Sequence, residues 1–169
     1  MSSFRKPPRC HKQSGVMLLE ALIGLLIFSI GILAMIGMQA ISIKNSASAT
    51  YRSEASYLAN QIISQMWASV LRNADGTINE ADFATYALNS ADATCTVGAN
   101  ATGGVNANVV NWLGSDVSRL PQPHTGALRQ IITTTAGTHD VTVTLCWGEW
   151  NDVTKTVVKH NFVATAQIN

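Results

Sequence analysis

The feature that most constrains this chain of 169 residues is an uninterrupted apolar run near its N-terminus. Residues 21–43 contain no charged side chain and no proline, and most of them are Leu, Ile, Met, Gly or Ala. As an α-helix this run is about 35 Å long, enough to cross a hydrocarbon core of about 30 Å. Only 12% of all residues are charged, roughly half the share in an average soluble domain. The sequence therefore predicts one membrane-spanning helix.

Charge is distributed unevenly on the two sides of this run. Residues 1–15 carry four basic residues and no acid, whereas residues 16–169 carry seven basic residues and ten acidic ones, a net charge of −3. The positive-inside rule then keeps the N-terminus cytoplasmic and exports the C-terminal domain. Because the exported domain lacks the basic face that nucleic acid requires, no nucleic-acid partner is expected.

The three cysteines follow the same division. Cys10 lies in the basic segment, whereas Cys95 and Cys146 lie in the C-terminal half. If the basic segment is removed, an even pair remains, and an even pair in an exported domain indicates a disulfide. Such a bond would constrain the unfolded chain by about 4 kcal/mol. Two unrelated buried thiols are the alternative.

Three interpretations of the N-terminal third compete. A secretory signal peptide would be cut before Thr50, after an Ala-x-Ala triplet at 47–49. However, the apolar run is about twice as long as a normal signal core, and Lys44 precedes the site. A plain single-pass anchor is the second interpretation, and it explains everything except Glu20. The third is a signal that is cut on the cytoplasmic side, so that the apolar helix is retained.

Glu20 distinguishes the last two interpretations. A carboxylate at the edge of an apolar span costs about 1–3 kcal/mol and is functional by default. The purely structural explanation is that an acid in the first turn of a helix is favoured by the helix dipole. That explanation says nothing about the residues that precede Glu20.

The junction from Gly15 to Glu20 reads Gly-Val-Met-Leu-Leu-Glu after a basic leader, and it resembles the signal of type IV prepilins. The resemblance implies that prepilin peptidase cuts between Gly15 and Val16 and N-methylates Val16, although Phe or Met is commoner at this position. It also implies that Glu20 acts in assembly by pairing with the α-amine of a neighbouring subunit. An unpaired charge buried among packed helices would cost several kcal/mol, so misplaced subunits would be rejected.

The downstream run, from Leu19 through Ser29-Ile30-Gly31-Ile32-Leu33 to Gln39, is similar to the PilV family of minor pilins. Gly37 stands where many major pilins have a proline. The resemblance implies a minor subunit of a Gram-negative type IV pilus that primes or modifies pilus assembly. The implied partners are other pilins and minor pilins, prepilin peptidase, the inner-membrane assembly platform and lipid. The implied location is first the inner membrane, with a periplasmic domain, and then the filament at the cell surface.

Two alternatives to a minor pilin stay open. The first is a minor pseudopilin of type II secretion, which shares the cleavage motif. The second is a single-pass anchored enzyme or binding protein outside the cytoplasm. Gly24 and Gly31 share a helix face that suits close helix packing, but ordinary membrane glycines explain them equally well.

The expected fold class is α+β, with a long N-terminal helix packed on a small antiparallel sheet. The domains are a leader (1–15), a membrane and filament-core helix (16–43) and an extracytoplasmic pilin-like domain (44–169). Within that domain we expect a helix continuation (44–72), a loop region with short helices (73–126) and strands (127–169). An apolar stripe predicts that the helix extends to about residue 72; its members are Tyr51, Ala55, Leu58, Ile62, Met66 and Val70.

Local patterns also predict the smaller elements. Short helices are expected at 80–88 and 107–120, the latter with Val109, Leu113, Val117 and Leu120 on one face. Strands are expected at 127–135, 139–147 and 156–166, which are rich in Val, Ile and Thr. In the middle strand, Val141, Val143, Leu145 and Trp147 alternate with polar residues and should face the helix, with Cys146 on the other face.

No catalytic, cofactor or metal site is expected. Residues 71–82 partly resemble a calcium loop. However, the first ligand position is Leu71 and the twelfth is the shorter Asp82, so a polar turn after the helix is the better interpretation. His124, His139 and His160 are scattered without ligand spacing. No nucleophile motif or phosphate-binding loop is present, so the chain is not expected to be an enzyme. Trp147 and Trp150 indicate a partner surface or, more simply, the cap of a small core.

Overall fold

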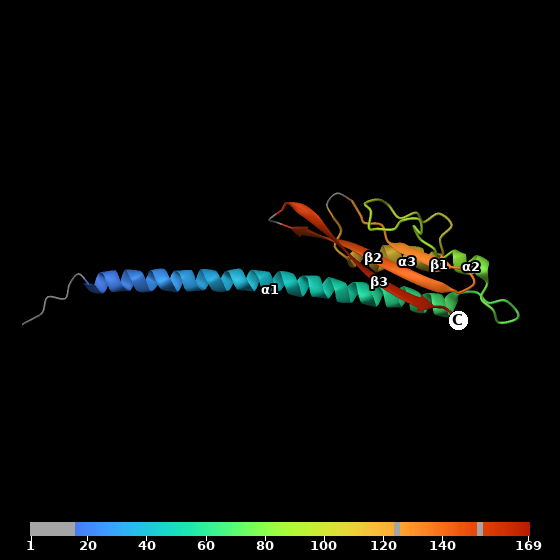
Figure 1. Cartoon of the computed structure of the whole chain (residues 1–169), viewed down its shortest axis with the longest axis horizontal. Helices are drawn as coiled ribbons and strands as arrows, with labels where there is room; N and C mark the ends of the chain where they lie inside the picture. Colours follow the sequence, from blue (N-terminus) through green and yellow to red (C-terminus); the bar gives the residue numbers. More distant parts are fainter. Residues whose placement is uncertain (1–15, 124–125, 152–153) are drawn as a thin grey trace, which may run out of the picture. The chain divides into compact units, whose positions relative to one another are not determined.

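A computed structural model describes residues 16–123, 126–151 and 154–169. The chain divides into two compact units, one up to Ser46 and one comprising residues 47–169. Helix α1 (Val16–Ser69) contributes to both units. The second unit also holds α2 (Glu80–Ala84), α3 (Ala107–Ser115), the 3₁₀ turn η1 (Val117–Arg119) and strands β1 (Ile131–Thr135), β2 (Asp140–Asn151) and β3 (Thr156–Gln167) (Figure 1). These elements confirm a long apolar helix and a small antiparallel sheet.

The C-terminal part of α1 forms one wall of the domain core. Its predicted stripe is confirmed, because Ala55, Leu58, Ile62 and Met66 are all fully buried. The helix ends at Ser69, slightly before the predicted end. Leu71 instead donates its main-chain N–H to the carboxylate of Asp82 at 2.8 Å, and the next residue forms an isolated β-bridge. The side-chain carboxylate thus replaces the next helical hydrogen bond.

The sheet forms the opposite wall of the core. Its strands are antiparallel in the order β1-β2-β3, and β2 pairs with β3 along its whole length. The predicted alternation in β2 is confirmed: Val141, Val143 and Leu145 are fully buried and Trp147 nearly so, in one cluster with the α1 stripe. The loop segment before β1, drawn in yellow-green in Figure 1, lies on the other side of the sheet from α1.

The predicted strand boundaries were wrong at the start of β1 and at both ends of β2. β1 begins at Ile131 instead of residue 127, because Leu128 bridges to Val97 in the preceding loop and so leaves the edge of β2. β2 begins one residue late, because His139 has φ 53° and belongs to the turn. It also continues past Trp147 to Asn151, because Gly148 pairs with Lys159 of β3 and does not end the strand.

Gly148 is needed there for close packing. Its main-chain N–H donates to the carbonyl of Pro121 at 3.0 Å, so a crossing segment lies against the strand. A Cβ at Gly148 would lie 2.8 Å from Val157 Cγ1 and 2.9 Å from Pro123 Cγ. A side chain at this position would therefore collide with both neighbours.

The predicted helices are both shorter than expected. α2 ends at Ala84, where the main-chain N–H of Thr85 donates to the carbonyl of Asp82, and Leu88 is free to bridge to Ile132. α3 ends at Ser115, and the predicted last turn is the separate 3₁₀ turn η1. The predicted face is largely confirmed, because Val109, Val117 and Leu120 are buried. Trp112, which the prediction did not include, is also 1% exposed, and its indole N–H donates to the Leu58 carbonyl of α1 at 3.1 Å.

Candidate functional site

The first candidate site is the exposed apolar part of α1. From Val16 to Ser46 every residue is exposed, and none of the most apolar window of the helix is buried within the chain. That window has a mean hydropathy of 2.6, and α1 is long and apolar enough to cross a membrane. Each large apolar side chain gains about 1.5–3 kcal/mol on leaving water. The segment therefore requires a cover that the chain itself does not supply, either lipid or other protein.

Glu20 is an exposed acid within this apolar surface. As described, helix α1 runs from Val16, so Glu20 lies in its second turn. Gly15, the predicted cleavage junction and Cys10 lie outside the described residues.

The polar and small residues of the apolar segment leave a smooth helix surface. The hydroxyl of Ser29 donates to the Leu25 carbonyl at 2.7 Å, so it needs no partner outside the helix. A Cβ added at Gly24, Gly31 or Gly37 would meet nothing within 4 Å. These glycines are open to close approach by another helix, as the sequence suggested.

The second candidate site is the disulfide that joins the loop region to the sheet. Cys95 and Cys146 are bonded, with a Cα–Cα distance of 5.7 Å and a sequence separation of 51, so the predicted pairing is confirmed and the alternative of two free thiols is wrong. Cys146 lies on the face of β2 opposite the α1 stripe, as predicted. The bond therefore fastens the loop to the outer face of the sheet.

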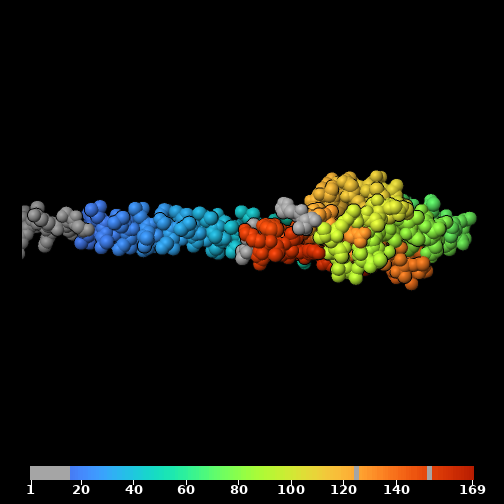
Figure 2. Space-filling model, turned by 90° about the horizontal axis from the view of Figure 1, so that it is seen from above, coloured from blue at the N-terminus to red at the C-terminus, as the bar shows by residue number. Residues whose placement is uncertain are grey.

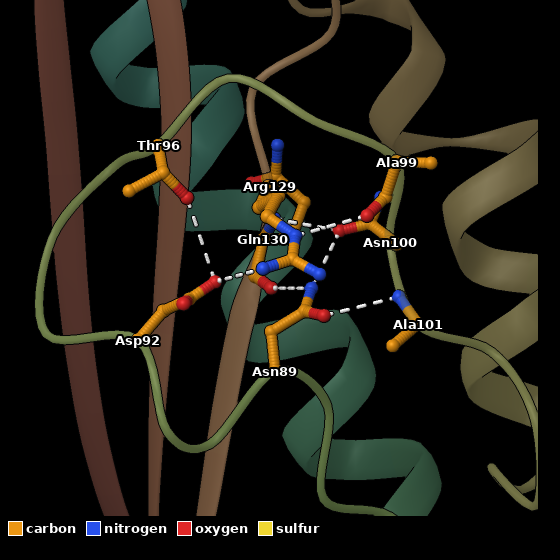
Figure 3. A network of polar contacts seen from close by, with 8 residues as sticks. All are labelled: Asn89, Asp92, Thr96, Ala99, Asn100, Ala101, Arg129 and Gln130. Carbon is orange, nitrogen blue, oxygen red and sulfur yellow. Dashed lines mark hydrogen bonds and ion pairs between the residues drawn. The ribbon is translucent and has the colours of Figure 1, made fainter.

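A polar network, not evident from the sequence, joins the loop to the residues just before β1 (Figure 3). It includes Gln130, which is 1% exposed and is the only buried polar or charged residue in the described part of the chain. Its amide oxygen accepts from the Cys146 N–H at 2.7 Å, and its amide N–H donates to the Cys146 carbonyl at 3.0 Å. The Gln130 side chain thus forms the two hydrogen bonds that a main-chain peptide group of a longer β1 would form with Cys146. Without this side chain, the main-chain N–H and carbonyl of Cys146 would be buried without hydrogen-bond partners.

Asn89, Asn100 and Arg129 extend the network into the loop. Asn89 has φ 45°, and its amide N–H groups donate to the Gln130 carbonyl at 2.8 Å and to Asn100 Oδ1 at 2.9 Å. Arg129 donates to the carboxylate of Asp92 at 3.0 Å and to the Ala99 carbonyl at 2.9 Å. Figure 3 shows these side chains converging between the loop and the residues just before β1. Loop residues 89–101 are therefore held by hydrogen bonds as well as by the disulfide.

We expect Gln130→Met to destabilise the domain by about 2–4 kcal/mol, because it leaves two buried main-chain groups of Cys146 without partners at about 1–3 kcal/mol each. Methionine keeps the length of the side chain, so the loss reports the hydrogen bonds more than the packing. Chemical denaturation of the full chain in detergent, followed by circular dichroism, measures the change in unfolding free energy.

Gln167→Met is the matched control, since Gln167 is exposed at the end of β3 and donates to a single carbonyl, that of Thr138. Its effect should stay within about 0.5 kcal/mol. Equal effects of the two substitutions would contradict the role of Gln130 as the partner of Cys146.

The polar turn after α1 is held by its own side chains. The carboxylate of Asp75 accepts hydrogen bonds from the hydroxyl of Thr77 at 2.6 Å and from its main-chain N–H at 3.0 Å. These bonds, the hydroxyl first, lower the pKa of Asp75 below the ordinary aspartate value. Within the described part of the chain, no group of three or more His, Cys, Asp or Glu residues is arranged to hold a metal ion.

We expect Thr77→Val to raise the pKa of Asp75 toward its ordinary value, because the substitution removes the hydroxyl that stabilises the carboxylate. Because the pKa of Asp75 is lowered in the folded chain, its carboxylate stabilises the turn at pH values above the ordinary aspartate pKa. This contribution to stability is lost as the pH falls through the pKa that Asp75 has in the folded chain. Titration of the carboxyl carbon by NMR measures the shift. Thr85→Val is the control and should leave the pKa of Asp75 as it is in the parent chain. An unchanged pKa of Asp75 in Thr77→Val would contradict this assignment.

Of the histidines considered as metal ligands, His139 and His160 have structural partners, and His124 lies outside the described residues. His139 lies 2.9 Å from Glu80 and contacts the ring of Phe83 edge-on. The ring of His160 stacks on that of Trp147, with 5.6 Å between the centroids. Trp147 therefore caps the core, which is one of the two interpretations that the sequence left open. Trp150 is 47% exposed. Comparisons of the chain with protein-family models, with curated proteins and with solved structures gave no match.

Proposed function

We propose that this chain is a minor pilin of a Gram-negative type IV pilus, similar to the PilV family. In this proposal prepilin peptidase cuts after Gly15, and Val16 becomes the N-methylated first residue. The mature subunit is held in the inner membrane by α1 and then joins the filament through the same helix. It primes or modifies assembly and has no enzymatic role.

The observation that carries the proposal is a lone carboxylate on an apolar helix that has no cover within the chain. Lipid would cover the apolar side chains but would leave Glu20 costly. Packing against other helices covers the apolar side chains and also offers a counter-charge. Cleavage before Val16 would create such a charge, the α-amine, about one helical turn from Glu20.

The domain features fit the same compartment. A disulfide persists in oxidising compartments outside the cytoplasm, and Cys95–Cys146 lies in the unit that follows the apolar segment. The Ala-x-Ala triplet of the competing signal-peptide interpretation lies inside α1, where Ala47 and Ser48 are partly buried. Removal of residues up to 49 would therefore take part of the helix that the domain packs against.

The mature N-terminus tests the proposal. The full chain is produced with and without a prepilin peptidase, extracted in detergent and analysed by mass spectrometry and N-terminal sequencing. We expect N-methylated Val16 only when the peptidase is present. An intact Met1 or Ser2 in both samples would support a plain anchor instead, and a start at Thr50 would support a secretory signal.

Substitutions beside the junction provide a matched pair. Gly15→Val should block processing, because a bulky residue at the cut keeps the peptide from the protease. Ser14→Val, one residue earlier, should be processed as in the parent chain. Processing of both variants at equal rates would argue against cleavage after Gly15.

A further inference from the structure

The two cysteines of the disulfide differ in exposure. Cys146 is 0% exposed, whereas Cys95 is partly exposed in the loop. A depression of about 280 Å³ opens beside Cys95; its lining includes Thr94 on the loop and Thr144, Lys159 and Asn161 on the sheet. Figure 2 shows the yellow-green atoms of the loop next to red atoms of the C-terminal strand. A reagent from solution therefore meets Cys95 before it meets Cys146.

We propose that Cys95 is the thiol through which this disulfide is formed and broken. We further propose that the depression beside it receives the reactive cysteine of a dithiol–disulfide oxidoreductase. Exchange proceeds by attack of a thiolate on a disulfide sulfur through a mixed disulfide between the two proteins. The intermolecular bond therefore forms at the cysteine that the partner meets first, which is Cys95.

The steps balance as two successive exchanges. The Cys95 thiolate attacks one sulfur of the partner's disulfide, forms the mixed disulfide and releases the partner's second cysteine as a thiolate that takes up a proton. The Cys146 thiolate then attacks the Cys95 sulfur, closes the Cys95–Cys146 bond and releases the partner's first cysteine. The two thiols of this chain lose two electrons and two protons, and the partner's disulfide gains them. Reduction retraces these steps, with the external thiolate attacking Cys95.

The surroundings of Cys95 suit the first exchange. The ammonium of Lys159 donates to the main-chain carbonyl of Cys95 at 3.1 Å, and both residues line the same depression. A positive charge in this depression favours the thiolate form of a cysteine that opens onto it. The ion pair between Arg129 and Asp92 holds the loop just before Cys95. Gln130 holds the main chain of Cys146. The loop therefore stays near the sheet before the bond closes, which favours the second, intramolecular exchange.

The decisive experiment maps the mixed disulfide on the folded protein. The full chain carrying only Cys10→Ser is oxidised, exposed to reduced glutathione in detergent and quenched with acid and excess maleimide. Peptide mass spectrometry should find glutathione on Cys95 and maleimide on Cys146, with at least about a tenfold preference. Urea-unfolded protein, in which both sulfurs are exposed, should show no such preference. An even distribution in the folded protein, an excess on Cys146, or no adduct would overturn the proposal.

Two matched pairs test the surroundings. Lys159→Met should slow the glutathione reaction several-fold relative to Lys155→Met, which removes an exposed charge from the same hairpin. Thr94→Trp should fill the depression, and it should slow reoxidation by a purified thioredoxin-fold dithiol oxidase more than reoxidation by oxidised glutathione. Thr102→Trp, exposed on the neighbouring part of the loop, should affect neither. Equal rates of reoxidation by the enzyme in both tryptophan variants would refute docking at the depression.

Discussion

Glu20→Val is expected to leave the chain processed and inserted in the membrane but to remove it from the filament. In the proposed assembly the substitution leaves the α-amine of a neighbouring Val16 buried without a counter-ion. Breaking a buried ion pair by removing one partner costs about 3–5 kcal/mol, which corresponds to a loss of roughly a hundredfold or more in incorporation. Immunoblots of sheared pili against the membrane fraction measure the ratio.

The controls separate docking from helix stability and insertion. Glu20→Asp keeps the charge on a shorter side chain and should restore part of the incorporation. Glu54→Val removes an acid from the same helix but in the domain unit, and should join the filament normally. Parent levels of Glu20→Val in sheared pili would refute the docking role, whereas absence of the variant from the membrane would show that Glu20 acts in insertion instead.

Loss of the disulfide is expected to produce the largest change in stability of the folded domain. With a sequence separation of 51 between the bonded residues, the chain-entropy estimate for the unfolded state is about 4 kcal/mol. Cys95→Ala combined with Cys146→Ala removes both thiols and so avoids intermolecular pairing. Urea denaturation of the full chain in detergent, followed by circular dichroism, measures the difference from the oxidised parent.

Cys10→Ala is the natural control, because Cys10 lies in the proposed leader and not in residues 47–169, the unit that contains the disulfide; its effect should stay within about 0.5 kcal/mol. The polar network around Gln130 should keep the loop on the sheet in the double variant, so we expect a cooperative transition at lower urea concentration. A double variant as stable as the parent would show that this network alone determines the stability of the loop.

The sequence predicted those features that depend on neighbours along the chain. The span in α1 follows from composition over residues 21–43, and the buried stripe around Leu58 and Ile62 follows from helical periodicity. The alternation in β2 follows from the pleat of a strand. The pairing of Cys95 with Cys146 was predictable because these are the only two cysteines after residue 15. The proposed role of Glu20 also rests on the sequence, since the carboxylate contrasts with every residue around it.

Only the tertiary structure revealed the features that depend on residues far apart. Gln130 gives no sequence signal of burial, and its role arises because β1 leaves the edge of β2 and exposes the main chain of Cys146. In the sequence alone, nothing distinguishes Asn89, Asp92 and Arg129 from ordinary polar residues of a loop. Their hydrogen bonds form only when the loop folds back onto the sheet. The unequal exposure of the two cysteines is likewise a property of packing, because Cys146 lies within the central strand and Cys95 lies in the loop. Hydropathy and periodicity act locally, whereas the satisfaction of buried polar groups is decided by segments that meet only in the folded chain.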